Sequence, residues 1–429
     1  MSEALTFEPG RACAEALDAA DPLAAFRDEF SIPPPKNGRD CVYLCGNSLG
    51  LQPKRARRYV EEELDDWAVL GVDGHLHAKR PWLPYHRFAT GGLAELTGSQ
   101  PAEVVAMNTL TVNLHVMMTT FFRPEPAKGR RKIVIESTAF PSDRFAAVSQ
   151  LRLHGLDPGE DLLEWSPREP DGPLEIGDLE ALLEQHGREV ALMLLPGVQY
   201  LNGQVLPMQA LCALARRAGC RIGLDLAHAI GNVELRLHDW GPDFAAWCHY
   251  KYLNGGPGAV AGAFVHERHL GGDGSNALLG WWGHEERTRF RMAPTFIPAE
   301  GAELWQLSNP PILSLAPVVA SLEIFGEAGM ARLREKSRAL TSYTAWLIEE
   351  TFGDRIVSIT PETERGCQLS LVVRDGRRSP REVFDRLQEL NVVTDWREPN
   401  VIRAAPVPLY NRFTDAYDFV ARLGKAVGD

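Results

Sequence analysis

The middle of the chain alternates short apolar runs with amphipathic stretches. The apolar runs that predict buried strands are residues 132–136, 190–195, 220–225, 244–248 and 259–265. A helix is predicted between the second and third of these, because Pro207 opens a run of helical periodicity that Gly219 closes. Strands that alternate with helices predict an α/β fold with a mostly parallel sheet covered on both faces.

The pattern changes after about residue 310. The predicted elements there are a long amphipathic helix at 330–352, strands at 367–374 and 392–396, a helix that starts in the capping box Ser379-Pro380-Arg381-Glu382, and a last helix after Thr414. These elements predict a smaller α+β unit. We therefore expect a large domain at 46–315, a small domain at 316–429 and an N-terminal segment, 1–45, that packs with the small domain.

Composition and charge exclude several classes of function. The net charge of −12 argues against a nucleic-acid surface, which needs a clustered basic patch. We expect no membrane partner, because the chain has no run of about 18 apolar residues and its first residues do not resemble a signal peptide. The seven cysteines are scattered without a C-x-x-C pair, which predicts reduced thiols, a cytoplasmic location and no structural metal site.

Lys251 stands out among the eight lysines of the chain. It follows the predicted strand 244–248 and precedes the glycine-rich run 254–258, and the carboxyl ends of strands are where open α/β sheets bind ligands. Partial burial there disfavours the charged form and leaves an amine that can form a Schiff base. Taken alone, Lys251 is better explained as a surface lysine in a loop.

Asp225 and His228 end another predicted strand, 26 residues before the lysine. A buried aspartate needs a partner. In a pyridoxal-phosphate site that partner is the ring nitrogen, which the carboxylate keeps protonated so that the ring can accept electrons. The structural alternatives are a helix cap for Asp225 and a core histidine for His228.

Two further segments suit the same chemistry. Phe140 follows the predicted strand 132–136 and is able to stack on a planar ring, with Ser142 and Asp143 beside it. The run Met107-Asn108-Thr109-Leu110-Thr111 precedes a helical pattern, which suits a phosphate held at a helix N-terminus. Each segment is weak evidence alone.

Taken together, these segments resemble the kynureninase family nearly end to end. The motifs that carry the resemblance are YLCGNSLGLQP at 43–53, KRPW at 79–82 with His75 before it, MNTLTVNLH at 107–115, FPSD at 140–143, GNVEL at 231–235, LHDW at 237–240, YKYLN at 250–254, GWWGH at 280–284 and SNPPIL at 308–313. The resemblance implies the type I fold of pyridoxal-phosphate-dependent transferases, with a large domain on a mostly parallel seven-stranded sheet between helices and a small α+β domain.

The resemblance also implies roles for individual residues. Lys251 would carry pyridoxal 5'-phosphate as a Schiff base, Asp225 would pair with the ring nitrogen, and Phe140 would stack on the ring. The rest of the cofactor pocket would comprise Leu110, Thr111, Pro141, Ser142, Asp143, His228 and Tyr250, joined by Trp281 and Asn309 from the neighbouring subunit of a homodimer. The residues that would face the substrate are Ser48, His75, His284, Asn309 and Arg403, the last as the clamp of the α-carboxylate.

The implied reaction is hydrolysis of the Cβ–Cγ bond of L-kynurenine or 3-hydroxy-L-kynurenine, which gives L-alanine and an anthranilate in tryptophan catabolism or NAD biosynthesis. Lys251 would remove the α-proton, and Tyr250 is the candidate for proton transfer at the carbonyl or the β-carbon. One departure from the family pattern is Pro196, at a position where relatives often carry a hydroxyl.

Two rival hypotheses remain. A cysteine desulfurase of the same fold needs a nucleophilic cysteine on a mobile loop, whereas Cys248 and Cys367 lie in predicted strands. A non-catalytic cofactor-binding regulator would be expected to lack Lys251, Asp225 or Arg403. The choice between the two kynurenine substrates depends on one ring hydroxyl, which the sequence does not decide.

Overall fold

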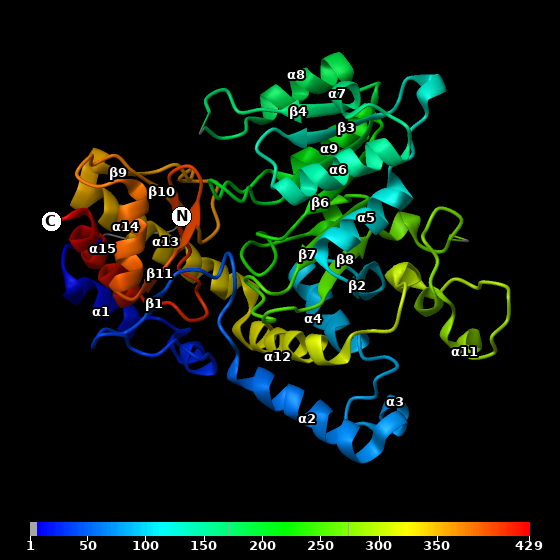
Figure 1. Ribbon diagram of the computed structural model, residues 1–429, viewed down its shortest axis with the longest axis horizontal. Coiled ribbons are helices and arrows are strands. Elements are labelled where there is room, and N and C mark those ends of the chain that lie inside the picture. Colours follow the sequence, from blue (N-terminus) through cyan, green and yellow to red (C-terminus); the bar gives the residue numbers. More distant parts are fainter. Residues whose placement is uncertain (1–6, 171, 273) are drawn as a thin grey trace.

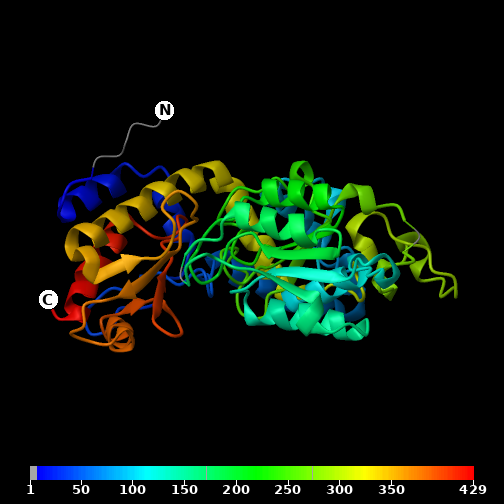
Figure 2. The same ribbon diagram turned by 90° about the horizontal axis from the view of Figure 1, so that it is seen from above.

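The computed structural model describes residues 7–429 except 171 and 273. Its ribbon forms two parts that lie side by side along the longest axis (Figure 1). The same two parts are distinct when the molecule is seen from above (Figure 2). The boundaries expected at residues 45 and 315 stay predictions.

The larger part is built on a seven-stranded sheet in the order β2-β8-β7-β6-β5-β3-β4. Its strands are β2 (Val104–Ala106), β3 (Lys132–Glu136), β4 (Leu162–Trp165), β5 (Val190–Pro196), β6 (Arg221–Asp225), β7 (Phe244–Cys248) and β8 (Ala261–Val265). Neighbouring strands from β7 to β4 are parallel, whereas β8 runs antiparallel to both of its neighbours. The five predicted strands are confirmed, each to within two residues.

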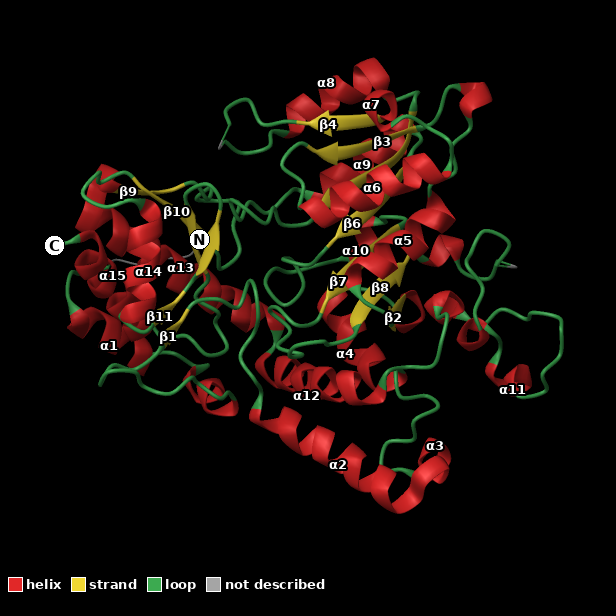
Figure 3. Ribbon diagram, viewed as in Figure 1, coloured by secondary structure: helices red, strands yellow, loops and turns green. Residues whose placement is uncertain are grey.

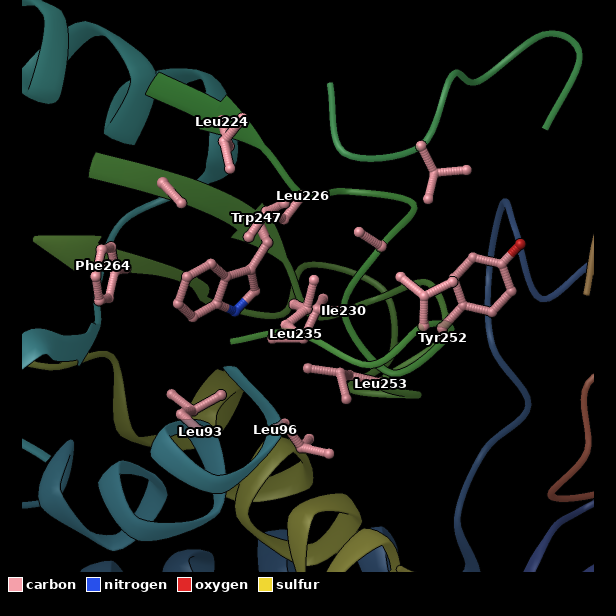
Figure 4. Packing of buried hydrophobic residues seen from close by; sticks show 14 of the residues in the cluster. Leu93, Leu96, Leu224, Leu226, Ile230, Leu235, Trp247, Tyr252, Leu253 and Phe264 are labelled. Carbon is pink, nitrogen blue, oxygen red and sulfur yellow. The ribbon is translucent and has the colours of Figure 1, made fainter. Parts of the chain in front are cut away.

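Helices cover both faces of this sheet, as secondary-structure colouring shows (Figure 3). The longer ones are α4 (Arg87–Thr97), α5 (Leu110–Phe121), α6 (Pro141–Leu153), α8 (Ile176–His186), α9 (Met208–Ala218) and α12 (Ile312–Ala328). Successive strand residues point to opposite faces. Ile133 and Leu192 pack with α5 and α6. Leu224 and Trp247 pack with α4, α9 and α12, and Figure 4 shows both residues in the same cluster as Leu93 of α4. Both faces of the sheet are therefore buried, as parallel sheets require.

The smaller part has an antiparallel sheet in the order β12-β13-β10-β9. Its strands are β9 (Ile356–Ser358), β10 (Leu369–Val373), β12 (Asp395–Arg397) and β13 (Val401–Ala404), and its helices are α13 (Met330–Phe352), α14 (Pro380–Glu389) and α15 (Phe413–Val427). The helices confirm the predictions for this region. In the capping box of α14 the backbone N–H of Ser379 donates to Glu382 Oε2 over 2.8 Å.

The single strand predicted at 392–396 is wrong. The chain forms two strands there, because β11 (Val392–Val393) pairs with β1 (Val42–Tyr43) while β12 joins the antiparallel sheet. Thr394, which is buried, lies between the two strands. An apolar run predicts extended structure but not which sheet it joins, and the pairing of Asp395 with Arg403 takes the chain into the second sheet.

The N-terminal segment contacts the smaller part through α1 (Arg11–Ala19). Asp18, near the end of α1, accepts hydrogen bonds from the backbone N–H of Phe413 over 2.6 Å and from Thr414 Oγ1 over 2.6 Å, both at the start of α15. Arg11 Nη1 donates to Asp418 Oδ1 over 2.6 Å. The first half of the last helix, α15, therefore holds α1 in place.

The remaining helices lie mostly at the surface. They are α2 (Lys54–Leu70), α3 (Gly74–His77), α7 (Pro158–Asp161), α10 (Leu237–Trp240) and α11 (Glu286–Arg289). Exposed large apolar side chains concentrate in two segments, 64–76 and 278–297, which project from the larger part in Figure 1. Among the described residues no single helix is long and apolar enough to span a bilayer; α12 and the helical stretch that follows it pass that test only as a pair, which is bent by 80°.

Candidate active site

The carboxyl ends of the parallel strands open onto a cavity of about 290 Å³. Glu136, Pro196 and Asp225 end β3, β5 and β6, and Lys251 follows β7 by three positions. This edge is where open α/β sheets bind ligands. A cavity of about 690 Å³ lies near the opposite edge, beside Arg221, but none of the described residues that line it belongs to the predicted site. The smaller cavity is therefore the candidate active site because of the residues that line it, and not because of its size.

Lys251 is held in a tight turn against the segment before α2. Its carbonyl accepts from the backbone N–H of Asn254 over 3.0 Å, and Asn254 has φ 52°, which an asparagine tolerates. The N–H of Gly50 donates to the carbonyl of Tyr250 over 2.9 Å. A Cβ at Gly50 would lie 2.3 Å from the Lys251 carbonyl oxygen, so this position requires glycine.

Three carboxyl groups, Glu136, Asp143 and Asp225, line the same cavity. Burial raises the pKa of Asp225, although the N–H of Ala227 donates to its Oδ1 over 2.7 Å and the Lys251 charge also opposes the rise. Burial and the neighbouring Asp225 raise the pKa of Asp143 well above its usual range. Burial also raises the pKa of Glu136 to about 8. The cluster is therefore partly protonated at neutral pH, and a cation placed beside it would restore its negative charge.

His228 follows Asp225 by three residues and is buried. Burial, followed by the charges of Lys251, Arg403 and Arg397, lowers its pKa well below the usual value, so the imidazole is neutral. Its Nδ1 has no hydrogen-bond partner among the described residues. Since buried polar atoms are normally paired, this nitrogen is available to a bound ligand.

Two helix N-termini, those of α5 and α6, meet at the cavity. Thr111 Oγ1 lies 2.8 Å from Ser142 Oγ, so hydroxyls from the two first turns are in hydrogen-bond contact. The first backbone N–H groups of a helix have no partner within it and attract anions. Phe140, directly before α6, is 45% exposed, and its ring meets the Tyr200 ring edge-on at 5.2 Å between centroids. This corner suits a phosphate next to a planar ring.

Arginines of the smaller part close the cavity. Arg403 on β13 is fully buried and donates from Nη1 to the carbonyl of Tyr200 over 2.6 Å. Its Nη2 contacts Asp395, directly opposite on β12. Arg397 on β12 also lines the cavity, as does Ser48 from the segment before α2.

The structure brings together most of the predicted site residues but not all of them. The predicted residues that line the cavity are Ser48, Leu110, Thr111, Phe140, Ser142, Asp143, Asp225, His228, Tyr250, Lys251 and Arg403. Pro141 is the first residue of α6, next to the cavity. Within this single chain, four predicted residues lie away from it: His75, Trp281, His284 and Asn309. Trp281 and Asn309 were expected from a neighbouring subunit.

These four residues have partners or exposure of their own. His75 Nδ1 is 2.9 Å from the carbonyl of Val72, and His284 Nε2 is 2.9 Å from Thr288 Oγ1. Trp281 is 45% exposed and Asn309 is exposed. A second copy of the chain is therefore able to reach Trp281 and Asn309 without unfolding any element.

Sequence reasoning missed several residues that line the cavity. They are Asn47, Glu136, Val198, Tyr200, Ala227 and Arg397. A signal existed for Glu136, because it is the charged end of an apolar strand.

A cluster of Glu103, His238 and His266 lies elsewhere, with possible ligand atoms within 4.8 Å of one another. The Glu103 carboxylate already accepts from the backbone N–H groups of Gln100 and Glu267, and lies 3.1 Å from His238 Nδ1. His266 Nδ1 accepts from the N–H of Arg268 over 3.2 Å. These hydrogen bonds account for the cluster as a structural feature.

Comparison with known sequences agrees with the motifs. A family model described as the kynureninase C-terminal domain matches residues 333–423. Proteins named kynureninase from Xanthomonas oryzae pv. oryzae (strain PXO99A), Xanthomonas campestris pv. campestris (strain B100) and Xanthomonas axonopodis pv. citri (strain 306) are 54%, 54% and 53% identical to this chain. Each alignment covers 96% of this chain and 97% of the relative.

Comparison with solved structures concerns the fold. The cystine C–S lyase C-DES, in complex with its product cysteine persulfide, has a TM-score of 0.75 at 18% identity, covering 90% of this chain and 97% of that one. A C-DES mutant with glycine covalently linked to its PLP cofactor scores 0.74 at 17% identity and covers 90% and 96%. An apo cysteine desulfurase from Thermococcus onnurineus NA1 scores 0.72 at 16% identity and covers 90% and 94%. The predicted fold class is confirmed.

Proposed function

This chain belongs to the kynureninase family, and on that premise we propose how its residues perform the reaction of the family. That reaction is the pyridoxal-phosphate-dependent hydrolysis of L-kynurenine or 3-hydroxy-L-kynurenine to L-alanine and an anthranilate. The observation that carries the proposal is that Lys251, Asp225 and Arg403, which come from three distant parts of the sequence, line one cavity of about 290 Å³.

The residues of this cavity fit pyridoxal phosphate. The clearest sign is the unpartnered, buried Nδ1 of His228 beside the partly protonated carboxyl cluster, because both lack a polar or cationic partner that the cofactor would provide. Lys251 would hold the cofactor covalently, and Asp225 would pair with its ring nitrogen. The N-termini of α5 and α6, with Thr111 and Ser142, would hold the phosphate.

When bound, pyridoxal phosphate would supply an electron-accepting ring. The amine of Lys251, which lines the same cavity, would take the proton from the α-carbon of the substrate. Tyr250 is the candidate that moves a proton at the γ-carbonyl oxygen or the β-carbon in the next steps. Burial raises the pKa of Tyr250, so its phenol is protonated at neutral pH and is able to donate. Arg403 clamps the α-carboxylate and so orients the α-carbon toward Lys251.

The cysteine-desulfurase alternative is not supported by the thiols near the site. Cys248 and Cys367 are buried, and Cys367 lies two residues before β10. Burial raises the pKa of both thiols, that of Cys367 to about 12. Neither is an accessible thiolate on a loop, which such an enzyme requires. The likeness to the C–S lyase C-DES and to a cysteine desulfurase is one of fold, at 18% and 16% identity.

We also propose that the enzyme is a cytoplasmic homodimer with its site at the subunit interface. Exposed apolar residues in 64–76 and 278–297 support association, since large exposed apolar surfaces mark interaction sites. Trp281, in the second segment, would reach the cofactor pocket of the other subunit.

The proposed cytoplasmic location is supported by the cysteines. All seven are free, which suits a reducing compartment.

The test of the proposal is to locate the cofactor on the chain. Borohydride reduction of the yellow holoenzyme, followed by digestion and mass spectrometry, should place the pyridoxyl group on the peptide that contains Lys251. The Lys251→Ala variant should lose this label and its turnover, whereas a Lys425→Ala control on α15 should keep both. A label on any other lysine of the wild-type enzyme would contradict the assignment.

A further inference from the structure

Arg397, like Arg403, lines the cavity. It lies on β12, the edge strand of the small sheet, two positions after Asp395. Residues two apart on a strand share a face. Asp395 is directly opposite Arg403 in the pairing of β12 with β13. Asp395, Arg397 and Arg403 therefore lie on one face of the small sheet, next to the cavity.

One carboxylate oxygen joins the two arginines. Asp395 Oδ2 lies 3.1 Å from Arg397 Nη2 and also contacts Arg403 Nη2. Two guanidinium charges therefore meet one carboxylate charge, and the trio carries one net positive charge. A ligand with a single carboxylate would neutralise this trio.

Both arginines retain a free donor. Arg397 Nε and Arg403 Nε are buried, and neither has a hydrogen-bond partner among the described residues. Arg403 is wholly buried, whereas the side chain of Arg397 is 36% exposed. A carboxylate has two oxygens, and a buried N–H without an acceptor is costly to leave unpaired. The pair of free donors matches the pair of acceptors on one carboxylate.

We infer that Arg397 is a second ligand of the α-carboxylate of the substrate, held beside Arg403 by Asp395. The inference rests on the proposed function, because it takes an amino-acid substrate as given. Arg403 forms the buried end of the carboxylate site and Arg397 its solvent-facing end. A carboxylate that enters from solvent meets Arg397 first, and the same residue then covers it.

The experiment compares Arg397→Gln holoenzyme with wild type using three inhibitors of kynurenine turnover. L-Alanine has an amine and the α-carboxylate, ethylamine has the amine alone, and anthranilate has the carboxylate that forms at the γ-carbon. We expect the inhibition constant of L-alanine and the KM for L-kynurenine to rise by about 10- to 100-fold, with kcat within about threefold of wild type. Inhibition by ethylamine and by anthranilate should not change.

Three further variants make the result specific. Arg386→Gln, an exposed arginine on α14 of the same part of the chain, should leave every constant unchanged. In the Arg397→Gln/Arg403→Gln double variant the rise for L-alanine should be smaller than the product of the single effects, because both side chains bind one group. Arg397→Lys keeps the charge without the planar fork and should lie between wild type and Arg397→Gln, so it serves if the glutamine variant does not fold.

An unchanged L-alanine constant in Arg397→Gln would overturn the inference, and so would a change for anthranilate instead of L-alanine. L-Alanine binding can also be followed by the change that it causes in the visible absorbance of the bound cofactor. If wild type binds L-alanine by this measure but turns over neither kynurenine, the proposed function fails while the role of Arg397 is still decided by its L-alanine affinity.

Discussion

Thr111 and Ser142 are 31 residues apart in sequence, yet their hydroxyls lie 2.8 Å from each other. The contact joins the first turns of α5 and α6, so two helix N-termini point at one place. The N-terminus of each helix has the equivalent of about half a positive charge. An anion held between them is stabilised by both helices as well as by the two hydroxyls.

Removing one of these hydroxyls should weaken cofactor binding without preventing the chemistry. For Ser142→Ala we expect the dissociation constant of pyridoxal phosphate to rise by about 10- to 100-fold, since a hydrogen bond to a charged group contributes about 1.5–3 kcal/mol. Turnover at saturating cofactor should remain near wild type. Titration of the apoenzyme measures the constant, and Ser149→Ala, further along α6, is the matched control. Equal affinities for the two variants would remove Ser142 from the phosphate site.

Tyr250 is expected to matter for the chemical steps. If its phenol moves a proton at the carbonyl or the β-carbon, Tyr250→Phe should lower kcat by about 100-fold or more, the usual contribution of general acid–base catalysis. Stopped-flow and steady-state assays on cofactor-saturated enzyme measure the effect, with Tyr417→Phe on α15 as the control. Full turnover by Tyr250→Phe would assign the proton transfer to another group.

Glu136 should make the stability of the cofactor-free protein depend on pH. Its pKa is about 8 in the folded chain against an ordinary value of 4.5. Between these values the folded chain binds a proton that the unfolded chain has released, so stability falls as pH rises through this window. The loss is at most a few kcal/mol, because each unit of pKa difference corresponds to about 1.36 kcal/mol.

The Glu136→Gln variant removes this titration. The melting temperature of Glu136→Gln minus that of wild type should therefore be larger at pH 8 than at pH 5. Thermal unfolding of both apoproteins at the two pH values measures this difference. Glu350→Gln, an exposed residue of α13, should show no such gain. The same difference from wild type at both pH values would mean that Glu136 is ionised in the folded chain.

If the site is shared between subunits, two inactive variants should restore each other. Lys251→Ala removes the lysine of one site, and Trp281→Ala removes the aromatic side chain expected from the partner. Mixing and reassembly would place both defects in one site of each heterodimer and leave the other site intact, which restores about a quarter of wild-type activity. Absence of recovery, with heterodimers verified by mass, would place Trp281 in the site of its own chain or outside both.

The core of the fold and the cofactor side of the cavity could be predicted from the sequence because their signals are local. The strand ending at Asp225 and the strand before Lys251 are short apolar runs, and the carboxyl ends of parallel strands meet at one edge of a sheet. The same reasoning predicted Phe140, which follows the strand β3, and Thr111, which lies in the first turn of the helix α5.

The rest depended on strand pairing that periodicity does not contain. The split of 392–396 between two sheets follows from the choice of strand partner, which is Val42, far away in sequence, for Val392 and Arg403, close in sequence, for Asp395. For the same reason Arg397 could not be placed at the cavity beforehand, because its position depends on how β12 pairs with β13. Tyr200 was missed because it lies in a loop and contributes to the Arg403 site through its backbone carbonyl.

The most direct test of the account is a steady-state assay of the holoenzyme with L-kynurenine and with 3-hydroxy-L-kynurenine, following anthranilate fluorescence and L-alanine release, beside Lys251→Ala. We predict turnover of at least one substrate with equal amounts of the two products and no turnover by the variant. The ratio of the two kcat/KM values identifies the preferred substrate. A yellow, cofactor-loaded enzyme that turns over neither substrate would contradict this prediction.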